Sequence, residues 1–391
     1  MSYRILVVDD EPDLEDLITQ KFRREIREKE FEFGFACNGL EALTKLQGDN
    51  SDFDLVLTDI NMPEMDGLTL LSRMKEMENP LLRSVIVSAY GDLENIRTAM
   101  NRGAYDFVIK PIDLNDLEIT IRKCLEDLRR FKEAVKSRDR LVAIEKELGI
   151  ARAIQTTILP TRTPAISGRK EFDLFAQMIP AREVGGDLYD FFFVDKYRIG
   201  LVLGDVSGKG IPAALFMTVT KTLMKATALK GIPTDTCIES VNRILVDESL
   251  SSMFVTLFYG VLDTRNGMLE YTIGGHNPPY LVRGRCAEEL KSKSGLPVGM
   301  FKSAEYESNV IMLGRGDTLF LYTDGITEAM NKSEEMFEAH RLRECLQTSC
   351  GTPPEKLTKA VIDEVQAFAG GAEQSDDMTS LAVTYYGPSA G

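Results

Sequence analysis

The amino-acid sequence predicts two folded domains of different class, joined by a long helical linker. Residues 1–126 alternate short apolar runs with helical patterns, which is typical of a doubly wound α/β domain with a parallel sheet. Residues 161–391 contain many antiparallel-looking strand patterns and a few long helices, which favours an α+β fold built as a β-sandwich. Residues 127–160 belong to a stretch from Asp113 to Pro160 that has helical periodicity and a single glycine, which predicts a helix.

Length and composition narrow the class of protein. The 391 residues suffice for two or three domains, and 43% hydrophobic residues suffice for packed cores. A formal net charge of -15 argues against a broad nucleic-acid-binding surface. The sequence has no apolar run of about 18 residues and no signal-peptide pattern, so we expect a cytoplasmic protein without a membrane partner. Because the six cysteines are scattered and only two histidines are present, any metal must be held mainly by carboxylates.

In the first domain, polar side chains follow each apolar run that is expected to form a strand. The four runs are Ile5–Val8, Leu55–Thr58, Ser84–Val87 and Phe107–Ile109. The helical patterns of this domain are Leu14–Arg27, Leu40–Leu46, Leu68–Met77 and Leu93–Asn101. The residues directly after the runs are Asp9 and Asp10, Asp59, Ser88 and Lys110. Because the carboxyl ends of parallel strands meet at one edge of a sheet, we expect these side chains to converge there.

This set of residues has a chemical use. Clustered carboxylates repel one another unless a divalent cation lies among them. With the cation bound, one carboxylate can attack a phosphoryl group and form an acyl phosphate. Lys110 would neutralise a phosphoryl oxygen, and Ser88 would donate a hydrogen bond to it. The alternative is a set of ordinary loop residues, but matched residues at every strand end favour a site.

Residues 3–126 resemble the receiver domain of bacterial response regulators. The motifs that carry the resemblance are VVDDEP, LTDINMPEMDG, SAYGD and FVIKP. It implies a flavodoxin-like fold in which Asp59 accepts a phosphoryl group from a histidine kinase. It also implies that Mg²⁺ is held by Asp9, Asp10, Asp59 and the backbone carbonyl of Asn61. The switch residues that it implies are Ser88, Phe107 and Lys110.

In the second domain, carboxylates again stand beside strand patterns. The expected strands are Phe172–Met178, Arg198–Leu203, Phe254–Asp263, Met268–Ile273, Thr318–Tyr322 and Thr379–Tyr385, and the clearest helix is Pro212–Leu229. The strand-end carboxylates are Asp187, Asp205, Asp324 and Asp376. Four carboxylates without a histidine or cysteine partner suit two hard cations, which can activate a water for attack on phosphorus. A single Asp-Gly pair is more often a tight turn, so the prediction depends on the four positions together.

The segment from about Phe172 to Tyr386 resembles the metal-dependent PP2C-type phosphatases, and more narrowly their bacterial SpoIIE/RsbU-like branch. The motifs are EVGGDLYD, GDVSGKGIPAAL, GGHNPP, YTDGITEA and SDDMT. The resemblance implies hydrolysis of phosphoserine or phosphothreonine on proteins, often on anti-sigma-factor antagonists. The ligands that it implies for two Mn²⁺ or Mg²⁺ ions are Asp187, Asp205, the carbonyl of Val206, Asp324 and Asp376. Asp377 stays an alternative to Asp376, and His276 is either a general acid or a structural residue of a Gly/Pro turn.

The helical stretch carries two apolar seams. The first is formed by Ile121, Cys124, Leu128, Phe131 and Val135, and the second by Leu141, Ile144, Leu148, Ala151 and Ile158, with Gln155 polar inside it. The seams differ in register, with a break near Arg138, and such a break locally rewinds a coiled coil. One interpretation is a helix packed on its own domain. The other is a dimerising helix that carries a signal between the domains, and it predicts a homodimer.

Together these features predict a two-component response regulator whose output is a protein phosphatase. Phosphorylation of Asp59 would control the metal site of the second domain, with either sign of regulation. The alternative is a phosphatase-fold scaffold that has lost its chemistry and binds a partner protein. A DNA-binding regulator is disfavoured, because no helix-turn-helix and no basic domain follow the receiver-like segment.

Overall fold

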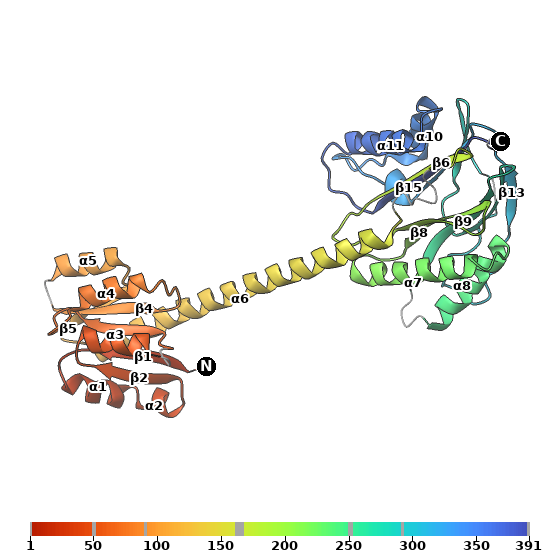
Figure 1. The fold of residues 1–391 in the computed structure, drawn as a ribbon. Helices are drawn as coiled ribbons and strands as arrows, with labels where there is room; N and C mark the ends of the chain where they lie inside the picture. Colours follow the sequence, from red (N-terminus) through yellow and green to blue (C-terminus); the bar gives the residue numbers. More distant parts are fainter. Residues whose placement is uncertain are drawn as a thin grey trace. The chain divides into compact units, whose positions relative to one another are not determined.

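The computed structural model describes residues 2–48, 52–89, 92–160, 168–248, 253–290 and 293–388. The chain divides into two compact units, residues 1–144 and residues 145–391. One long helix, α6 (Leu114–Ile158), belongs to both units and links them (Figure 1). None of the helices in the described part of the chain combines the length and the apolar character that a membrane crossing needs.

The first unit is a five-stranded parallel sheet with strand order β2-β1-β3-β4-β5 (Figure 1). Its strands are β1 (Tyr3–Val8), β2 (Phe31–Ala36), β3 (Leu55–Asp59), β4 (Arg83–Ala89) and β5 (Asp106–Lys110). Its other helices are α1 (Asp13–Lys21), α2 (Arg23–Arg27), α3 (Gly39–Gln47), α4 (Gly67–Glu76) and α5 (Leu93–Arg102). This arrangement confirms the predicted doubly wound α/β class.

Two details of the first unit differ from the sequence prediction. Strand β2 was not expected, although its sequence FEFGFA places phenylalanine at every second position, which is the period of a strand. The helix expected over residues 14–27 ends at Lys21 and restarts at Arg23. The break lies at Phe22, which is fully buried with its ring centroid 5.8 Å from that of Phe31. Packing against β2 therefore interrupts a pattern that is locally helical.

The first half of α6 packs on its own domain. Ile121, Cys124 and Leu128 are buried in the core of the first unit. Further along, the Arg83 guanidinium lies 5.5 Å from the ring of Phe131. The packing of the first unit thus continues beyond residue 126. The second domain is predicted to begin at residue 161, and residues 161–167 lie outside the described residues.

The second unit is a sandwich of two five-stranded antiparallel sheets, as predicted. The sheet orders are β13-β10-β9-β8-β7 and β12-β11-β14-β15-β6. The strands are β6 (Phe172–Ile179), β7 (Leu188–Phe193), β8 (Arg198–Val206), β9 (Val255–Asp263), β10 (Met268–Gly274), β11 (Tyr280–Arg283), β12 (Cys286–Glu289), β13 (Asn309–Met312), β14 (Thr318–Tyr322) and β15 (Met378–Tyr385). Leucines of β8, β14 and β15 meet in the core between the sheets.

Helices cover the outer faces of this sandwich. They are α7 (Ile211–Ala228), α8 (Thr234–Glu248), α9 (Asp324–Thr327), α10 (Glu338–Thr348) and α11 (Pro354–Ala369). Apolar residues of α7 and α8 pack on the sheet that contains β8 and β9. Those of α10 and α11 pack on the sheet that contains β14 and β15 (Figure 1). Both outer faces of the sandwich are therefore covered by helices.

Candidate functional sites

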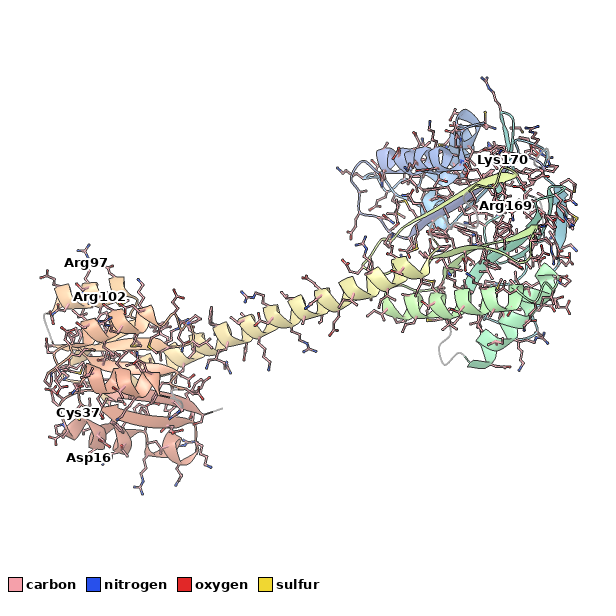
Figure 2. All side chains as sticks on the ribbon, viewed as in Figure 1. Asp16, Cys37, Arg97, Arg102, Arg169 and Lys170 are labelled. Atoms are coloured by element: carbon pink, nitrogen blue, oxygen red, sulfur yellow. The ribbon has the colours of Figure 1, made fainter. Side chains whose placement is uncertain are left out.

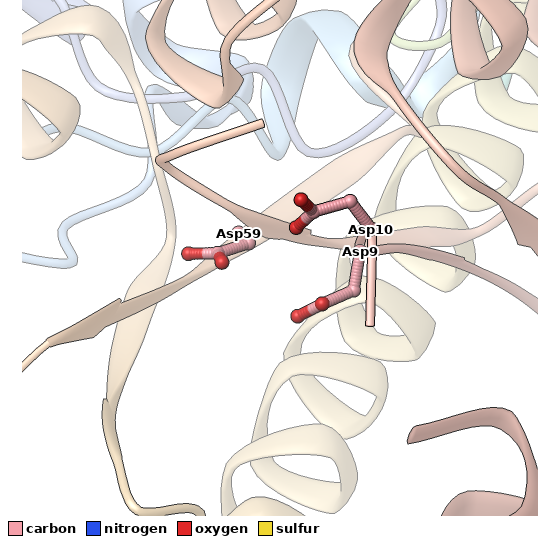
Figure 3. A group of neighbouring side chains, drawn as sticks. All are labelled: Asp9, Asp10 and Asp59. Atoms are coloured by element: carbon pink, nitrogen blue, oxygen red, sulfur yellow. The ribbon is translucent and has the colours of Figure 1, made fainter. Parts of the chain in front are cut away.

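Three carboxylates meet at the carboxyl ends of β1 and β3. Oxygen atoms of Asp9, Asp10 and Asp59 all lie within 4.8 Å of one another (Figure 3). The parallel register explains the meeting, because Val8 pairs with Thr58 and the aspartates directly follow these residues. The side chains of Asp9 and Asp59 are buried while Asp10 is exposed, and burial raises the pKa of Asp9. A cluster of oxygen ligands with like charges fits a hard divalent cation such as Mg²⁺.

Lys110 joins this cluster from the end of β5. Its Nζ lies 2.8 Å from Asp59 Oδ2, 3.0 Å from Asp9 Oδ2 and 3.0 Å from Glu11 Oε1. Burial alone would lower the pKa of this amine, but the hydrogen bonds to the carboxylates raise it above its ordinary value. The ammonium therefore stays charged beside the predicted phosphoacceptor.

The other predicted switch residues occupy neighbouring positions. Ser88 lies at the end of β4, between β3 and β5, and its hydroxyl is fully buried without a hydrogen-bond partner. Burying a hydroxyl without a hydrogen-bond partner costs about 1–3 kcal/mol of stability. A phosphoryl oxygen on Asp59 would accept a hydrogen bond from this hydroxyl and remove that cost. The side chain of Phe107 on β5 is 36% exposed. Asn61 lies in the exposed loop two residues after Asp59.

In the second unit, each sheet contributes two carboxylates. Asp187 precedes β7 and Asp205 lies near the end of β8, and these strands are antiparallel with Leu188 opposite Gly204. The next pair along this ladder is therefore Asp187 and Asp205. In the other sheet, Asp324 follows β14 and Asp376 precedes β15, whose ladder runs through Tyr322 opposite Ser380. The antiparallel register thus brings residues that are distant in sequence to one edge.

The carboxylates of the two pairs raise one another's pKa. Burial, followed by the charge of Asp324, raises the pKa of Asp205. Burial, followed by the charge of Asp205, raises the pKa of Asp187. Burial, followed by the charge of Asp376, raises the pKa of Asp324. Among the described residues, no three of these oxygens lie as close together as those of the first unit. The mutual repulsion would be relieved by divalent cations, so the donor set fits them.

Asp377 has a different environment from its neighbour Asp376. Its Oδ1 accepts a hydrogen bond from the amide of Ala181 at 2.8 Å, and its Oδ2 accepts one from the amide of Gly186 at 2.6 Å. A Cβ on Gly185 would lie only 2.4 Å from the same Oδ2, so a glycine is needed there. Asp377 therefore holds in place the loop of residues 183–187, called the EVGGD loop below. The sequence analysis did not recognise this role.

Two further contacts orient the acidic edge. The hydroxyl of Thr323, which is fully buried, donates to Asp187 Oδ2 at 2.8 Å. The carbonyl of Val206 lies against Gly186, where an added Cβ would come within 3.0 Å of the oxygen. The predicted carbonyl ligand is thus next to the loop that carries Asp187.

His276 is buried and bonds to a neighbouring strand. Its Nδ1 lies 2.9 Å from the hydroxyl of Thr256, at the start of β9. Burial lowers the pKa of this imidazole to about 4. The contacts support the structural interpretation of the histidine, because a neutral buried ring is poorly suited to give up a proton.

Helix α6 reaches the EVGGD loop directly. The side-chain amide of Gln155 donates to the carbonyl of Gly185 at 2.7 Å and accepts from its amide at 3.0 Å. One turn earlier, Arg152 lies 3.8 Å from Glu183. The signal for this contact was present in the sequence as a polar residue inside an apolar seam.

Two families match this chain. The response regulator receiver domain family matches residues 5–122, and the Stage II sporulation protein E (SpoIIE) family matches residues 195–386. Sporulation initiation phosphotransferase F of Bacillus subtilis is 34% identical over 125 residues, which cover 32% of this chain and 95% of that protein. The chain belongs to the response regulators. It carries a receiver domain followed by a SpoIIE-type domain.

Relatives and solved structures also match the SpoIIE-type domain. Phosphoserine phosphatase RsbU of Bacillus subtilis is 30% identical over 224 residues, which cover 57% of this chain and 65% of RsbU. This chain therefore spans less than two thirds of the length of that relative. The SiaA-PP2C domain of Pseudomonas aeruginosa has the same fold, with a TM-score of 0.57, 20% identity, and coverage of 63% of this chain and 98% of that one.

Proposed function

We propose that this response regulator is a metal-dependent phosphoprotein phosphatase controlled by phosphorylation of Asp59. The observation that carries the proposal is the acidic edge of the SpoIIE-type domain, where two antiparallel ladders align Asp187 with Asp205 and place Asp324 near Asp376. A set of four carboxylates at one edge is suited to phosphoester hydrolysis with two cations. The alternative, a silent scaffold, offers no reason for burying mutually repelling carboxylates.

The residues of the acidic edge have separate tasks in this proposal. Asp187, Asp205 and the carbonyl of Val206 would hold one side of a pair of Mn²⁺ or Mg²⁺ ions, and Asp324 and Asp376 the other. Two such ions supply Lewis-acid chemistry for attack of water on a phosphoester. Thr323 and Asp377 position these ligands through the hydrogen bonds described above.

The proposed substrate is a phosphorylated serine or threonine on a protein. RsbU and a second relative, RsbP of Bacillus subtilis, are both phosphoserine phosphatases by name. By analogy we propose that the substrate is an anti-sigma-factor antagonist. The receiver domain would take its phosphoryl group from a histidine kinase, with Asp9, Asp10 and the carbonyl of Asn61 holding Mg²⁺ beside Asp59.

In the receiver domain, Lys110 and Ser88 have complementary tasks. A phosphoryl group on Asp59 would compete for the ammonium of Lys110, which is now shared among three carboxylates. It would also give the buried Ser88 hydroxyl its missing acceptor. Both changes act on β4 and β5, which carry the exposed Phe107. Phosphorylation therefore has a direct structural consequence at the end of the sheet.

Helix α6 is the proposed route between the receiver and the phosphatase. Gln155 makes two hydrogen bonds to Gly185, two residues before Asp187, so a movement of α6 changes the position of a proposed metal ligand.

In the same proposal, two copies of the chain associate through α6. Leu141 and Ile144 of the second seam are 60% and 43% exposed, and the side chains of this part of α6 are drawn in Figure 2.

The experiment measures release of phosphate from a phosphoserine protein with Mn²⁺, with and without acetyl phosphate as donor to Asp59. We expect the rate to change with acetyl phosphate in the wild type and to stay constant in Asp59→Asn. Asp205→Asn should abolish hydrolysis and still accept a phosphoryl group at Asp59. Equal rates with and without verified phosphorylation would refute the coupling. Absence of hydrolysis by the wild type on every phosphoprotein tried, with Mn²⁺ present, would favour the scaffold.

A further inference from the structure

Lys209 is held over the acidic edge of the SpoIIE-type domain by a short glycine loop. The loop follows β8 and precedes α7, and its flanking residues Gly208 and Gly210 have φ angles of 89° and 77°. These left-handed conformations are favourable for glycine and costly for other residues. The loop therefore has a defined shape that points the chain, and Lys209 with it, toward the segment before β15.

The ammonium of Lys209 bonds to the segment that carries a proposed metal ligand. Its Nζ lies 2.9 Å from Asp376 Oδ2 and donates to the carbonyl of Ser375 at 2.6 Å. The side chains of Lys209 and Asp376 are 42% and 37% exposed, so water can reach the pair and the pair can open. The charge of Lys209 also acts on Asp324 and Glu328, the other acidic groups nearby.

We propose that Lys209 is an internal counter-ion that competes with a divalent cation for Asp376. This inference rests on the proposed function and adds to it a residue that sets metal affinity. A carboxylate oxygen that accepts a short bond from an ammonium has reduced negative charge available for a cation. A cation bound to Asp376 would also be repelled by the Lys209 ammonium, whose Nζ lies 2.9 Å from Asp376 Oδ2. Lys209 therefore weakens metal binding on the Asp324–Asp376 side and leaves the Asp187–Asp205 side less affected.

The geometry explains why a lysine suits this task. Its ammonium is a compact charge on a flexible stem, so it can leave Asp376 without disturbing the loop. Asp377 cannot change partners in the same way, because its oxygens are committed to the backbone amides of Ala181 and Gly186. The two adjacent aspartates thus differ. Oδ2 of Asp376 is held by the Lys209 ammonium and can be released to a cation, while its Oδ1 accepts the amide of Asp377 at 2.9 Å.

The test is calorimetric titration of Mn²⁺ into the metal-free full-length chain and three variants. Lys209→Met should bind Mn²⁺ about fivefold more tightly at one site, a change near the upper end expected for a partly exposed ion pair. Lys209→Arg keeps the charge and should bind like the wild type. Lys302→Met removes a more exposed lysine that pairs with Asp247 and not with a proposed metal ligand, and it should also match the wild type.

A double mutant tests whether Lys209 and the cation compete at Asp376 and not at another carboxylate. In an Asp376→Asn background, Lys209→Met should no longer change Mn²⁺ affinity, because the contested carboxylate is gone. The Mn²⁺ concentration for half-maximal phosphatase rate should fall in Lys209→Met in parallel with the titration. Unfolding curves of the metal-free variants check that each one folds.

The outcomes separate this inference from the proposal beneath it. Unchanged or weaker Mn²⁺ binding by a folded Lys209→Met variant would overturn the counter-ion role while leaving the metal site in place. If neither the wild type nor the variant binds Mn²⁺ at the SpoIIE-type domain, both the metal site and the counter-ion role are wrong. Tighter binding that persists in the Asp376→Asn background would place the competition at another carboxylate and would also contradict the inference.

Discussion

At the scale of single residues, Asp376 and Asp377 illustrate how neighbours in sequence acquire different roles. Asp377 is 8% exposed and accepts hydrogen bonds from backbone amides of a loop almost 200 positions earlier. Asp376 is more exposed and pairs with Lys209. The contacts support our proposal that Asp376 is the metal ligand, because its Oδ2 pairs with the exposed Lys209 ammonium, and only its Oδ1 accepts a backbone amide, that of Asp377 at 2.9 Å.

Substitution of each aspartate by asparagine should separate these roles. Asp377→Asn replaces one acceptor oxygen by an N–H₂ group that faces a backbone donor, so we expect a loss of about 1–3 kcal/mol in the free energy of unfolding. Asp376→Asn should leave the stability of the metal-free protein nearly unchanged and weaken Mn²⁺ binding. Urea unfolding in EDTA and Mn²⁺ titration measure the two effects. A stable Asp377→Asn variant with normal activity would show that the loop does not need this carboxylate.

His276 predicts a dependence of stability on pH. Its pKa in the folded protein is lowered to about 4 by burial, so the unfolded chain binds a proton at pH values where the folded one does not. Its contribution to stability is therefore full above about pH 6.5 and is lost as the pH falls below that value. Between pH 7 and pH 5 the loss is about 2 kcal/mol. Urea unfolding should show this loss in the wild type relative to His276→Gln, and parallel pH profiles would rule out a buried neutral histidine.

At the scale of elements, α6 carries two kinds of surface along one helix. Its first part places Ile121, Cys124 and Leu128 in the receiver core, whereas Leu141 and Ile144 are exposed. Near its end, Gln155 is 5% exposed because it bonds to Gly185. The helix is continuous, so its two apolar seams differ in their surroundings and not in their secondary structure.

Removal of the Gln155 contact should affect both stability and regulation. Gln155→Leu keeps a similar volume but leaves the buried amide and carbonyl of Gly185 without partners, at a cost of about 1–3 kcal/mol. We expect a lower phosphatase rate and no response to acetyl phosphate, because the loop before Asp187 is no longer tied to α6.

The control for this experiment lies on the next residue of the same helix. Thr156→Ala removes only a hydroxyl that bonds to the carbonyl of Arg152 within α6. Its phosphatase rate and its response to acetyl phosphate should match the wild type. An intact response in a folded Gln155→Leu variant would show that the signal, if any, takes another path.

At the scale of the whole molecule, two acidic sites belong to two compact units. Each site gathers like charges that a cation would neutralise, and a ligand that binds only the folded state raises stability by mass action. Calorimetry should therefore show two thermal transitions. The midpoint temperature of each should rise by several degrees when the Mn²⁺ concentration exceeds the dissociation constant, and EDTA should reverse the rise.

Variants assign these transitions. The double substitution Asp9→Asn/Asp10→Asn should abolish the Mn²⁺ shift of the receiver transition alone, and Asp205→Asn that of the SpoIIE-type transition alone. A single cooperative transition would contradict the independence of the units. A shift of both transitions in either variant would mean that Mn²⁺ acts elsewhere on the chain.

Much of the architecture could be predicted from local patterns. Apolar runs that end in polar residues located β1, β3, β4 and β5, because a buried parallel strand has a nearly continuous apolar sequence. Strand β2 was missed, since an edge strand with alternating phenylalanines has a weaker signal. In the second domain, β7 was also missed, and so were the short strands β11, β12 and β13, because four residues carry little periodicity.

By itself, the sequence determined the two fold classes, the helical nature of the linker and the carboxylates at the strand ends. These follow from periodicity and from motifs in which neighbouring residues act together. Only the tertiary structure decided that Asp377 holds a loop, that Gln155 bonds to Gly185 and that Lys209 pairs with Asp376. The physical reason is that these contacts join segments 30 to 191 positions apart, and strand register, which no local pattern encodes, decides which side chains meet.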